Sequence, residues 1–451
     1  MQHRTRSEQK RRKSDSTPLE EPTLPAEPGQ PDQEMIPDWI ESQEGIQLGR
    51  VAATWSKTGR EIGLVSWLDK QLDDEGRPKR TKFPFWEFVA GVQSVLKLYP
   101  GKLPDEFCEQ LRILLSFGLS QAAEELRPGK SGDLAPQILK LTQRIEASDL
   151  EQLVRLAKSS KKGQLPAKFA DLSAISSSAH PKLILGCLRD GWKFPTTSLR
   201  IDQSAGGAST ALELQVESRD WLGPLWSLGP NSSSEPAVSV ARWRERTSSS
   251  TSDLLEWSFR IGTTRIIRTA LLLKEYKLAL LADQVDGPAN QTWTSQIDVG
   301  RLVRAETDTE NRGLNLQHTG QSSLCIWPLA LPSLPYVTER GQFRLDGSQL
   351  KLEQQTQIRR TWMPLLLSWD PARNRKPVHW RHLTVSESFK KCKPETAFAV
   401  RVGFKGLPSL VLYRSLSTPT RRAFLGHQTS ARMLIGQFDT DGTLKPIFEF
   451  E

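Results

Sequence analysis

Cysteine is scarce in this chain, and its placement argues against a disulfide-stabilised domain. The four cysteines, Cys108, Cys187, Cys325 and Cys392, lie far apart in the sequence, and no Cys-x-x-Cys pair occurs. Widely spaced cysteines without a regular framework are typical of free thiols in a reducing compartment. We therefore expect a cytoplasmic protein.

Long apolar runs and the common motifs of enzyme sites are also missing. No stretch of about 18 apolar residues occurs, so the sequence predicts no transmembrane helix. The basic start runs into Ser, Pro and Glu residues, unlike a secretory signal. Phosphate-loop, dinucleotide, zincin and hydrolase-elbow motifs are all absent, which removes support for those chemistries. The sequence predicts no cofactor.

Residues 1–36 have the composition of a disordered arm, because acidic residues and repeated prolines leave little apolar surface to bury. The net charge is +9, and six basic residues stand within the first thirteen positions. They are Arg4, Arg6, Lys10, Arg11, Arg12 and Lys13. Such an arm could contact nucleic acid or an anionic membrane, and a merely solvated terminus is the alternative.

A small helical domain is expected over residues 37–165. Apolar residues recur at helical spacing from Phe85 to Leu98, where Pro100 and Gly101 follow. Further helices are predicted after Pro104, from about Pro136 to Glu146, and after the capping pattern that begins at Ser148.

Residues 183–451 predict a large antiparallel β-sandwich, since strand patterns recur about every ten residues. Leu255 to Ile261 alternates apolar and polar residues, and Gly262-Thr263 predicts a turn. The apolar runs Arg265–Leu273 and Lys277–Val285 favour a hairpin, although periodicity alone does not exclude a helix. The strand count suits two large stacked sheets. The fold class is therefore α+β by segregation.

Two short segments carry a family resemblance. The pattern Arg268-x-x-Leu271-x-Leu273-Lys274, followed by Leu278-x-Leu280-x-x-Asp283-x-Val285-x-Gly287, resembles the C-terminal β-sandwich half of heparinase II/III-type polysaccharide lyases. The preceding Leu188-Arg189-Asp190-Gly191-Trp192 is similar to the opening segment of that half. The resemblance covers roughly Leu183 to the mid-300s.

The resemblance implies a catalytic α/α toroid before the sandwich, which supplies an Asn, a Tyr and a His. Residues 37–182 contain one tyrosine, Tyr99, and one histidine, His180, so a complete toroid is not expected. Some members of the family bind a metal in the sandwich, and Asp283 matches the aspartate position. No histidine follows at a ligand-like spacing, which favours a structural aspartate and no metal.

Surface candidates gather in one basic and aromatic segment. Alternation along a strand would place His379 and Arg381 on one face, and Val378, Trp380 and His382 on the other. Such groups suit an acidic sugar chain or a nucleic-acid strand, and a half-buried structural strand is the alternative. The binding candidates are Arg375, Lys376, His379, Trp380, Arg381, His382, Arg242 and Trp243.

Other segments repeat this chemistry in a weaker form. Arg359-Arg360-Thr361-Trp362 combines cations with an indole, and the stretch from Tyr413 to His427 indicates an edge strand protected by charge. The catalytic candidates are His379, Tyr276 and His180.

Three functions remain open at this stage. The first is a heparinase II/III-like sandwich that is catalytically degenerate and binds carbohydrate or a protein partner. The second is an active lyase that cleaves uronate-containing glycans by β-elimination. The third is a nucleic-acid-associated protein that uses the basic arm.

Overall fold

The computed structural model describes the C-terminal part of the chain almost continuously. It covers residues 197–451 apart from gaps at 204–206, 218, 232–236, 301–302, 308–311, 319–322, 335–340, 357 and 440–441. Residues 134–147, 178–179 and 185–190 are also described, with isolated positions between 89 and 154. The predicted arm over residues 1–36 lies outside the described residues.

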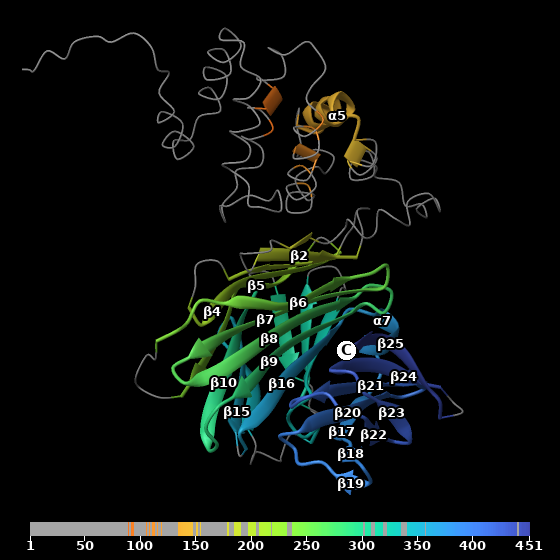
Figure 1. The fold of residues 1–451 in the computed structure, drawn as a ribbon. Helices are drawn as coiled ribbons and strands as arrows, with labels where there is room; N and C mark the ends of the chain where they lie inside the picture. Colours follow the sequence, from red (N-terminus) through yellow and green to blue (C-terminus); the bar gives the residue numbers. More distant parts are fainter. Residues whose placement is uncertain are drawn as a thin grey trace, which may run out of the picture. The chain divides into compact units, whose positions relative to one another are not determined.

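The described strands form four antiparallel sheets (Figure 1). The first sheet has the order β1 (Ser178–Ala179), β2 (Leu185–Arg189), β3 (Ser198–Asp202), β4 (Ser209–Val216), β5 (Arg219–Pro230), β10 (Gln291–Val299), β15 (Gln349–Thr356) and β14 (Gly341–Asp346). The second has the order β11 (Val303–Thr307), β12 (Leu314–His318), β13 (Ser323–Pro328), β16 (Arg360–Ser368), β9 (Leu278–Asp286), β8 (Thr264–Leu273), β7 (Ser252–Ile261) and β6 (Arg242–Ser248).

Two smaller sheets follow in the C-terminal part. The third sheet has the order β17 (Val378–His382), β20 (Ala397–Phe404), β21 (Leu407–Ser415), β24 (Met433–Phe438) and β25 (Leu444–Phe450). The fourth has the order β19 (Lys390–Lys391), β18 (Ser386–Glu387), β22 (Arg422–Phe424) and β23 (His427–Thr429). The predicted antiparallel sandwich is thereby confirmed.

The three strands β7, β8 and β9 confirm the predicted strand–turn–strand pattern. Gly262 adopts a φ of 58° between β7 and β8, a left-handed conformation that glycine reaches without strain. A second turn at residues 274–277 joins β8 to β9. These strands are adjacent in the second sheet, between β16 and the edge strand β6 (Figure 1).

The second sheet is buried on both faces. One face of β8, with Ile266 and Leu272, joins the hydrophobic core that contains Leu212 and Trp226 of the first sheet. The other face, with Leu271, joins the core that contains Val400 of the third sheet. Double burial explains why the apolar runs of β8 and β9 show no clean alternation.

The third and fourth sheets add layers beyond the two sheets expected from the sequence. Their shared core contains Ala399, Tyr413 and Phe424, and the Tyr413 and Phe424 rings stack 5.2 Å apart. The edge strand predicted between Tyr413 and His427 is wrong for β21 and β22, which lie inside the third and fourth sheets, and Arg422 is only 2% exposed. His427, at the end of the stretch, does begin the edge strand β23.

Two helices have described bounds. Helix α5 spans Leu134–Arg144 and overlaps the helix predicted from Pro136 to Glu146. The four-residue helix α7 spans Pro371–Asn374, and the Asp370 side chain caps it by accepting a hydrogen bond from the Ala372 N–H at 3.0 Å. The other predicted helices lie largely outside the described residues.

Candidate functional site

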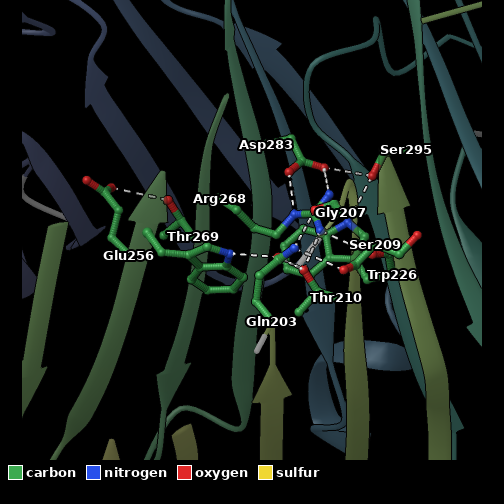
Figure 2. Close-up of polar contacts among 11 residues, drawn as sticks. Gln203, Gly207, Ser209, Thr210, Trp226, Glu256, Arg268, Thr269, Asp283 and Ser295 are labelled. Atoms are coloured by element: carbon green, nitrogen blue, oxygen red, sulfur yellow. Dashed lines mark hydrogen bonds and ion pairs between the residues drawn. The ribbon is translucent and has the colours of Figure 1, made fainter. Parts of the chain in front are cut away.

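A charged pair is buried between the first and second sheets. Arg268 on β8 stands directly opposite Asp283 on β9, and the Arg268 Nε donates to Asp283 Oδ1 at 2.7 Å. Both side chains are fully buried, and Figure 2 shows them at the centre of a polar network. The sequence pattern singled out these two residues without revealing that they pair.

The remaining polar atoms of this pair also have partners. Arg268 Nη1 donates to Thr210 Oγ1 at 2.6 Å and to the Trp226 carbonyl at 3.1 Å, while its guanidinium lies 4.2 Å from the centre of the Trp226 ring. The Ser295 hydroxyl donates to Asp283 Oδ2 at 2.9 Å. A buried ion pair with this many hydrogen bonds is well compensated, which supports a structural role.

The weak metal candidate Asp283 therefore faces a guanidinium. Arg268 supplies the positive charge next to its carboxylate. Within the described ranges, no group of three or more His, Cys, Asp or Glu side chains could hold a metal ion.

A second buried carboxylate joins the second sheet to the third. Glu256 on β7 contacts Arg414 Nη2 at 2.6 Å, Arg432 Nη2 at 3.1 Å and Arg244 Nε at 3.0 Å. Burial by itself would raise the pKa of Glu256, but the three guanidinium groups outweigh it, so the pKa is lowered. The charged carboxylate thus links strands from two sheets.

The basic and aromatic segment before β20 divides between the core and the surface. Val378 and Trp380 are buried, whereas His379, Arg381 and His382 are exposed. The Trp380 Nε1–H donates to the Leu331 carbonyl at 2.7 Å. This indole belongs to the core between the second and third sheets, so it is not available to a ligand.

Two exposed residues of this segment, His379 and Arg381, lie with Arg401 on the outer side of β17 and β20. Arg381 stands directly opposite Arg401, and His379 stands opposite Gly403. A Cβ atom on Gly403 would come within 2.6 Å of the His379 ring, which shows that the ring lies over the glycine. We call His379, Arg381 and Arg401 the basic face. Two further exposed cations, Arg375 and Lys376, lie just before β17.

The other sequence candidates do not join this face. Arg242 and Trp243 lie on β6, at the opposite edge of the second sheet from β11, and Trp243 packs edge-on against Trp257 with centroids 6.2 Å apart. Tyr276 packs partly buried against the core on the inner side of the third sheet. His180 lies outside the described residues. The structure therefore does not bring the candidates His379 and Tyr276 together.

A pocket of about 380 Å³ lies beside the first residues of β16. Its walls include Thr361 and Trp362 of β16, Gln354 of β15, His382 at the end of β17, and Phe398 of β20. The sequence had indicated His382 and the Arg359–Trp362 segment. It gave no signal for Gln354 or Phe398, because only the fold brings these strands together.

Among the described residues, no helix is long and apolar enough to cross a membrane. No protein-family profile matches the sequence, and no curated protein matches it.

The fold defines a class: a layered antiparallel β-sandwich. Solved structures with a similar fold are known. The crystal structure of heparinase III matches with a TM-score of 0.59 and 12% identity, over 83% of this chain and 68% of that chain. The heparan sulfate lyase HepC from Pedobacter heparinus matches with a TM-score of 0.55 and 13% identity, over 81% of this chain and 63% of that chain.

These likenesses show that the chain has a heparinase III-like fold, as the sequence resemblance predicted. The chain spans about two thirds of the length of the similar structures. At 12% and 13% identity, the likeness concerns the fold alone.

Proposed function

We propose that this protein binds an acidic polysaccharide on its basic face and does not cleave it. The observation that carries the proposal is the pair Arg381 and Arg401, two exposed arginines directly opposite one another on neighbouring strands. Like charges at such a position destabilise a sheet, since cross-strand neighbours have Cβ atoms about 5 Å apart. A bound polyanion relieves this repulsion.

The charges of the basic face are available to a ligand. Arg401 donates from Nε to the Ser409 hydroxyl at 2.9 Å and lies 5.3 Å from the centre of the Phe438 ring. Within the described part of the chain, no carboxylate forms an ion pair with Arg381 or Arg401. Guanidinium groups bind carboxylates and sulfates through paired hydrogen bonds, which fits an acidic glycan.

The fold favours a glycan over a nucleic acid as the polyanion. The similar structures are described as a heparinase III and a heparan sulfate lyase. Nucleic-acid binding through the basic arm at residues 4–13 remains an outcome that the binding experiment can reveal.

The absence of cleavage is proposed from the geometry. β-Elimination beside a uronate needs a base at the α-proton and a group that neutralises the carboxylate. Tyr276 and His379 lie on opposite sides of the third sheet, so they cannot serve one substrate together. An active lyase is the second candidate function, and the fold shared with the heparan sulfate lyase favours it.

The proposal includes a reducing compartment, with the cytoplasm as the expected location. Its support is that none of the four cysteines forms a disulfide, although Cys108 and Cys392 are only half-buried. Cysteines that stay reduced are typical of reducing compartments.

The test is a binding titration of the full chain with heparan sulfate, polygalacturonate and single-stranded DNA at several salt concentrations. We expect binding to a polyuronate, weakened at least tenfold when Arg381→Gln and Arg401→Gln are combined. Arg304→Gln, with a side chain 79% exposed on β11, is the matched control and should change little. Ultraviolet absorbance of the unsaturated product, followed in the same samples, would reveal a lyase.

Equal binding by the double variant and the wild type would show that Arg381 and Arg401 do not bind the polysaccharide. Binding to DNA alone would support the nucleic-acid function instead.

A further inference from the structure

A row of charged side chains crosses four neighbouring strands of the second sheet. Arg260 of β7 stands directly opposite Arg265 of β8. Asp286 of β9 stands opposite both Arg265 and Arg360 of β16. The four strands lie side by side in Figure 1, and residues directly opposite one another point to the same side of a sheet. We call these four residues the charged row.

The charged row points away from the first sheet. The next residues along three of its strands, Ile261, Ile266 and Val285, belong to the core that the second sheet shares with the first. Because successive side chains of a strand alternate between the two faces, the charged row lies on the opposite face. Arg260 is exposed there and the other three residues are half-buried, so solvent reaches the row.

The carboxylate of the row is already engaged. Asp286 Oδ2 accepts a hydrogen bond from Arg360 Nε at 3.3 Å, and Asp286 Oδ1 lies 3.5 Å from Arg359 Nε. Arg260 Nη1 donates to a neutral group, a backbone carbonyl of the turn that follows β7, at 3.1 Å. Arg265 forms no hydrogen bond and no ion pair with the residues that the structure describes. Its guanidinium therefore has donors to spare.

Positive charge is in excess around Arg265. The row itself holds three guanidinium groups and one carboxylate. Arg244 of β6 adds a further cation, and its countercharge Glu256 is shared with two other arginines. Burial lowers the pKa of Arg265 most, and the charges of Arg244 and Arg260 lower it further. Asp286 and Glu256 act in the opposite direction without cancelling these effects.

The missing partner is a compact anion with several acceptor oxygens. Neighbouring strands lie about 4.8 Å apart, so two opposite guanidinium groups can reach one such anion. Guanidinium groups bind phosphate through paired, charge-assisted hydrogen bonds. A phosphate monoester carries about 1.5 to 2 negative charges at pH 7, which matches the two positive charges that the row has in excess. A carboxylate supplies one negative charge and neutralises less.

We propose that Arg260 and Arg265 together bind a phosphate group, either free phosphate or the phosphate of an ester. Arg360 stays paired with Asp286 beside the site, and Arg244 adds positive potential from β6. The site lies on the second sheet, whereas the basic face lies on the third. The inference therefore does not rest on the proposed polysaccharide function.

The test is isothermal titration of the full chain with inorganic phosphate, glycerol phosphate and acetate, at constant ionic strength and about pH 8. We expect both phosphates to bind at least tenfold more tightly than acetate, and Arg265→Gln to lose at least tenfold in phosphate affinity. Arg265→Lys keeps the charge but loses the paired donors, so it should lose less. Arg304→Gln, an exposed arginine on β11 of the same sheet, is the matched control and should bind phosphate like the wild type.

Thermal unfolding gives a second readout. Without phosphate, Arg265→Gln should melt at the same temperature as the wild type or higher, because it removes one of two like charges that face each other. Added phosphate should raise the melting temperature of the wild type and leave that of Arg265→Gln unchanged, since only the wild type binds the anion. A variant that melts well below the wild type without phosphate would contradict the excess of positive charge.

The two phosphates distinguish the source of the group. Equal affinities would identify free phosphate as sufficient, and tighter binding of glycerol phosphate would identify an ester. Acetate binding as tight as phosphate, phosphate binding unchanged by Arg265→Gln, or no binding of either phosphate would overturn the site. Polysaccharide binding through Arg381 and Arg401 is measured separately, so the site and the proposed function can fail independently.

Discussion

At the scale of single residues, the buried charges distinguish this molecule from a simple apolar sandwich. Arg268, Arg414 and Arg422 are each at most 2% exposed. From the sequence alone, arginines are expected at the surface, because arginine is almost never buried unless it is paired with an acidic partner. Their partners, Asp283, Glu256 and Glu387, come from other strands, so this burial could not be predicted from local pattern.

The pair Arg268 and Asp283 allows a direct test of a structural role. We expect Asp283→Asn to destabilise the fold by about 3–5 kcal/mol, because it leaves the buried guanidinium without a countercharge. Combining Arg268→Met with Asp283→Leu should restore most of the loss. Urea unfolding of Arg268→Met, Asp283→Leu and the double variant measures the coupling. Additive losses would contradict the pairing.

Glu256 predicts an acid-sensitive contribution to stability. Its folded pKa lies below its unfolded value, so the stabilisation is complete above the unfolded pKa of about 4.3 and is lost as the pH falls through the folded pKa. Glu256→Gln should therefore be much less stable than the wild type at pH 7. The difference should shrink as the pH is lowered below about 4.

Thermal unfolding of the wild type and of Glu256→Gln across this pH range measures the difference in stability. The other carboxylates are the same in both proteins, so their titration cancels in that difference. A stability difference that stays constant with pH would contradict the assigned role of the Glu256 charge.

At the scale of elements, the strands β7, β8 and β9 could be predicted because their turns carry local signals. The Gly262-Thr263 turn and the polar residues after Leu273 mark the ends of the apolar runs. The arrangement of the strands into four sheets could not be predicted, because it depends on pairings between distant parts of the sequence. One example is the pairing of β16 with β9, which places Ser368 opposite Leu278. The pocket depends on the same non-local pairings.

The double burial of β8 can be tested with two consecutive residues. Leu271 and Leu272 are both fully buried but belong to different cores. We expect Leu271→Ala and Leu272→Ala each to cost about 2–5 kcal/mol. In a sandwich of only two sheets, one of them would face solvent and cost much less. A loss below about 1 kcal/mol for either variant, measured by urea unfolding, would contradict the layered fold.

At the scale of the whole described sandwich, the third sheet covers apolar surface of the second, and the fourth sheet packs against the third. Leu271, Leu280 and Leu366 of the second sheet share a core with Val400 and Ile435 of the third. Removing the C-terminal sheets would expose this surface to water. The second and third sheets therefore depend on one shared hydrophobic core.

A chain that ends at residue 376 should therefore not form a stable monomer. We expect aggregation, or strong binding of a dye that detects exposed apolar surface, because the face that contains Leu271 loses its cover. Size-exclusion chromatography with light scattering compares this chain with the full chain. A stable, monodisperse truncated protein would contradict the shared core.

We propose that this heparinase III-like fold binds an acidic polysaccharide through Arg381 and Arg401. The most direct measurement is binding of the full chain to heparan sulfate and polygalacturonate, with absorbance of the unsaturated product followed at the same time. We expect salt-dependent binding to one of these polymers that falls at least tenfold with Arg381→Gln and Arg401→Gln combined, and no rise in absorbance. Unchanged binding by that double variant, or steady product formation, would contradict it.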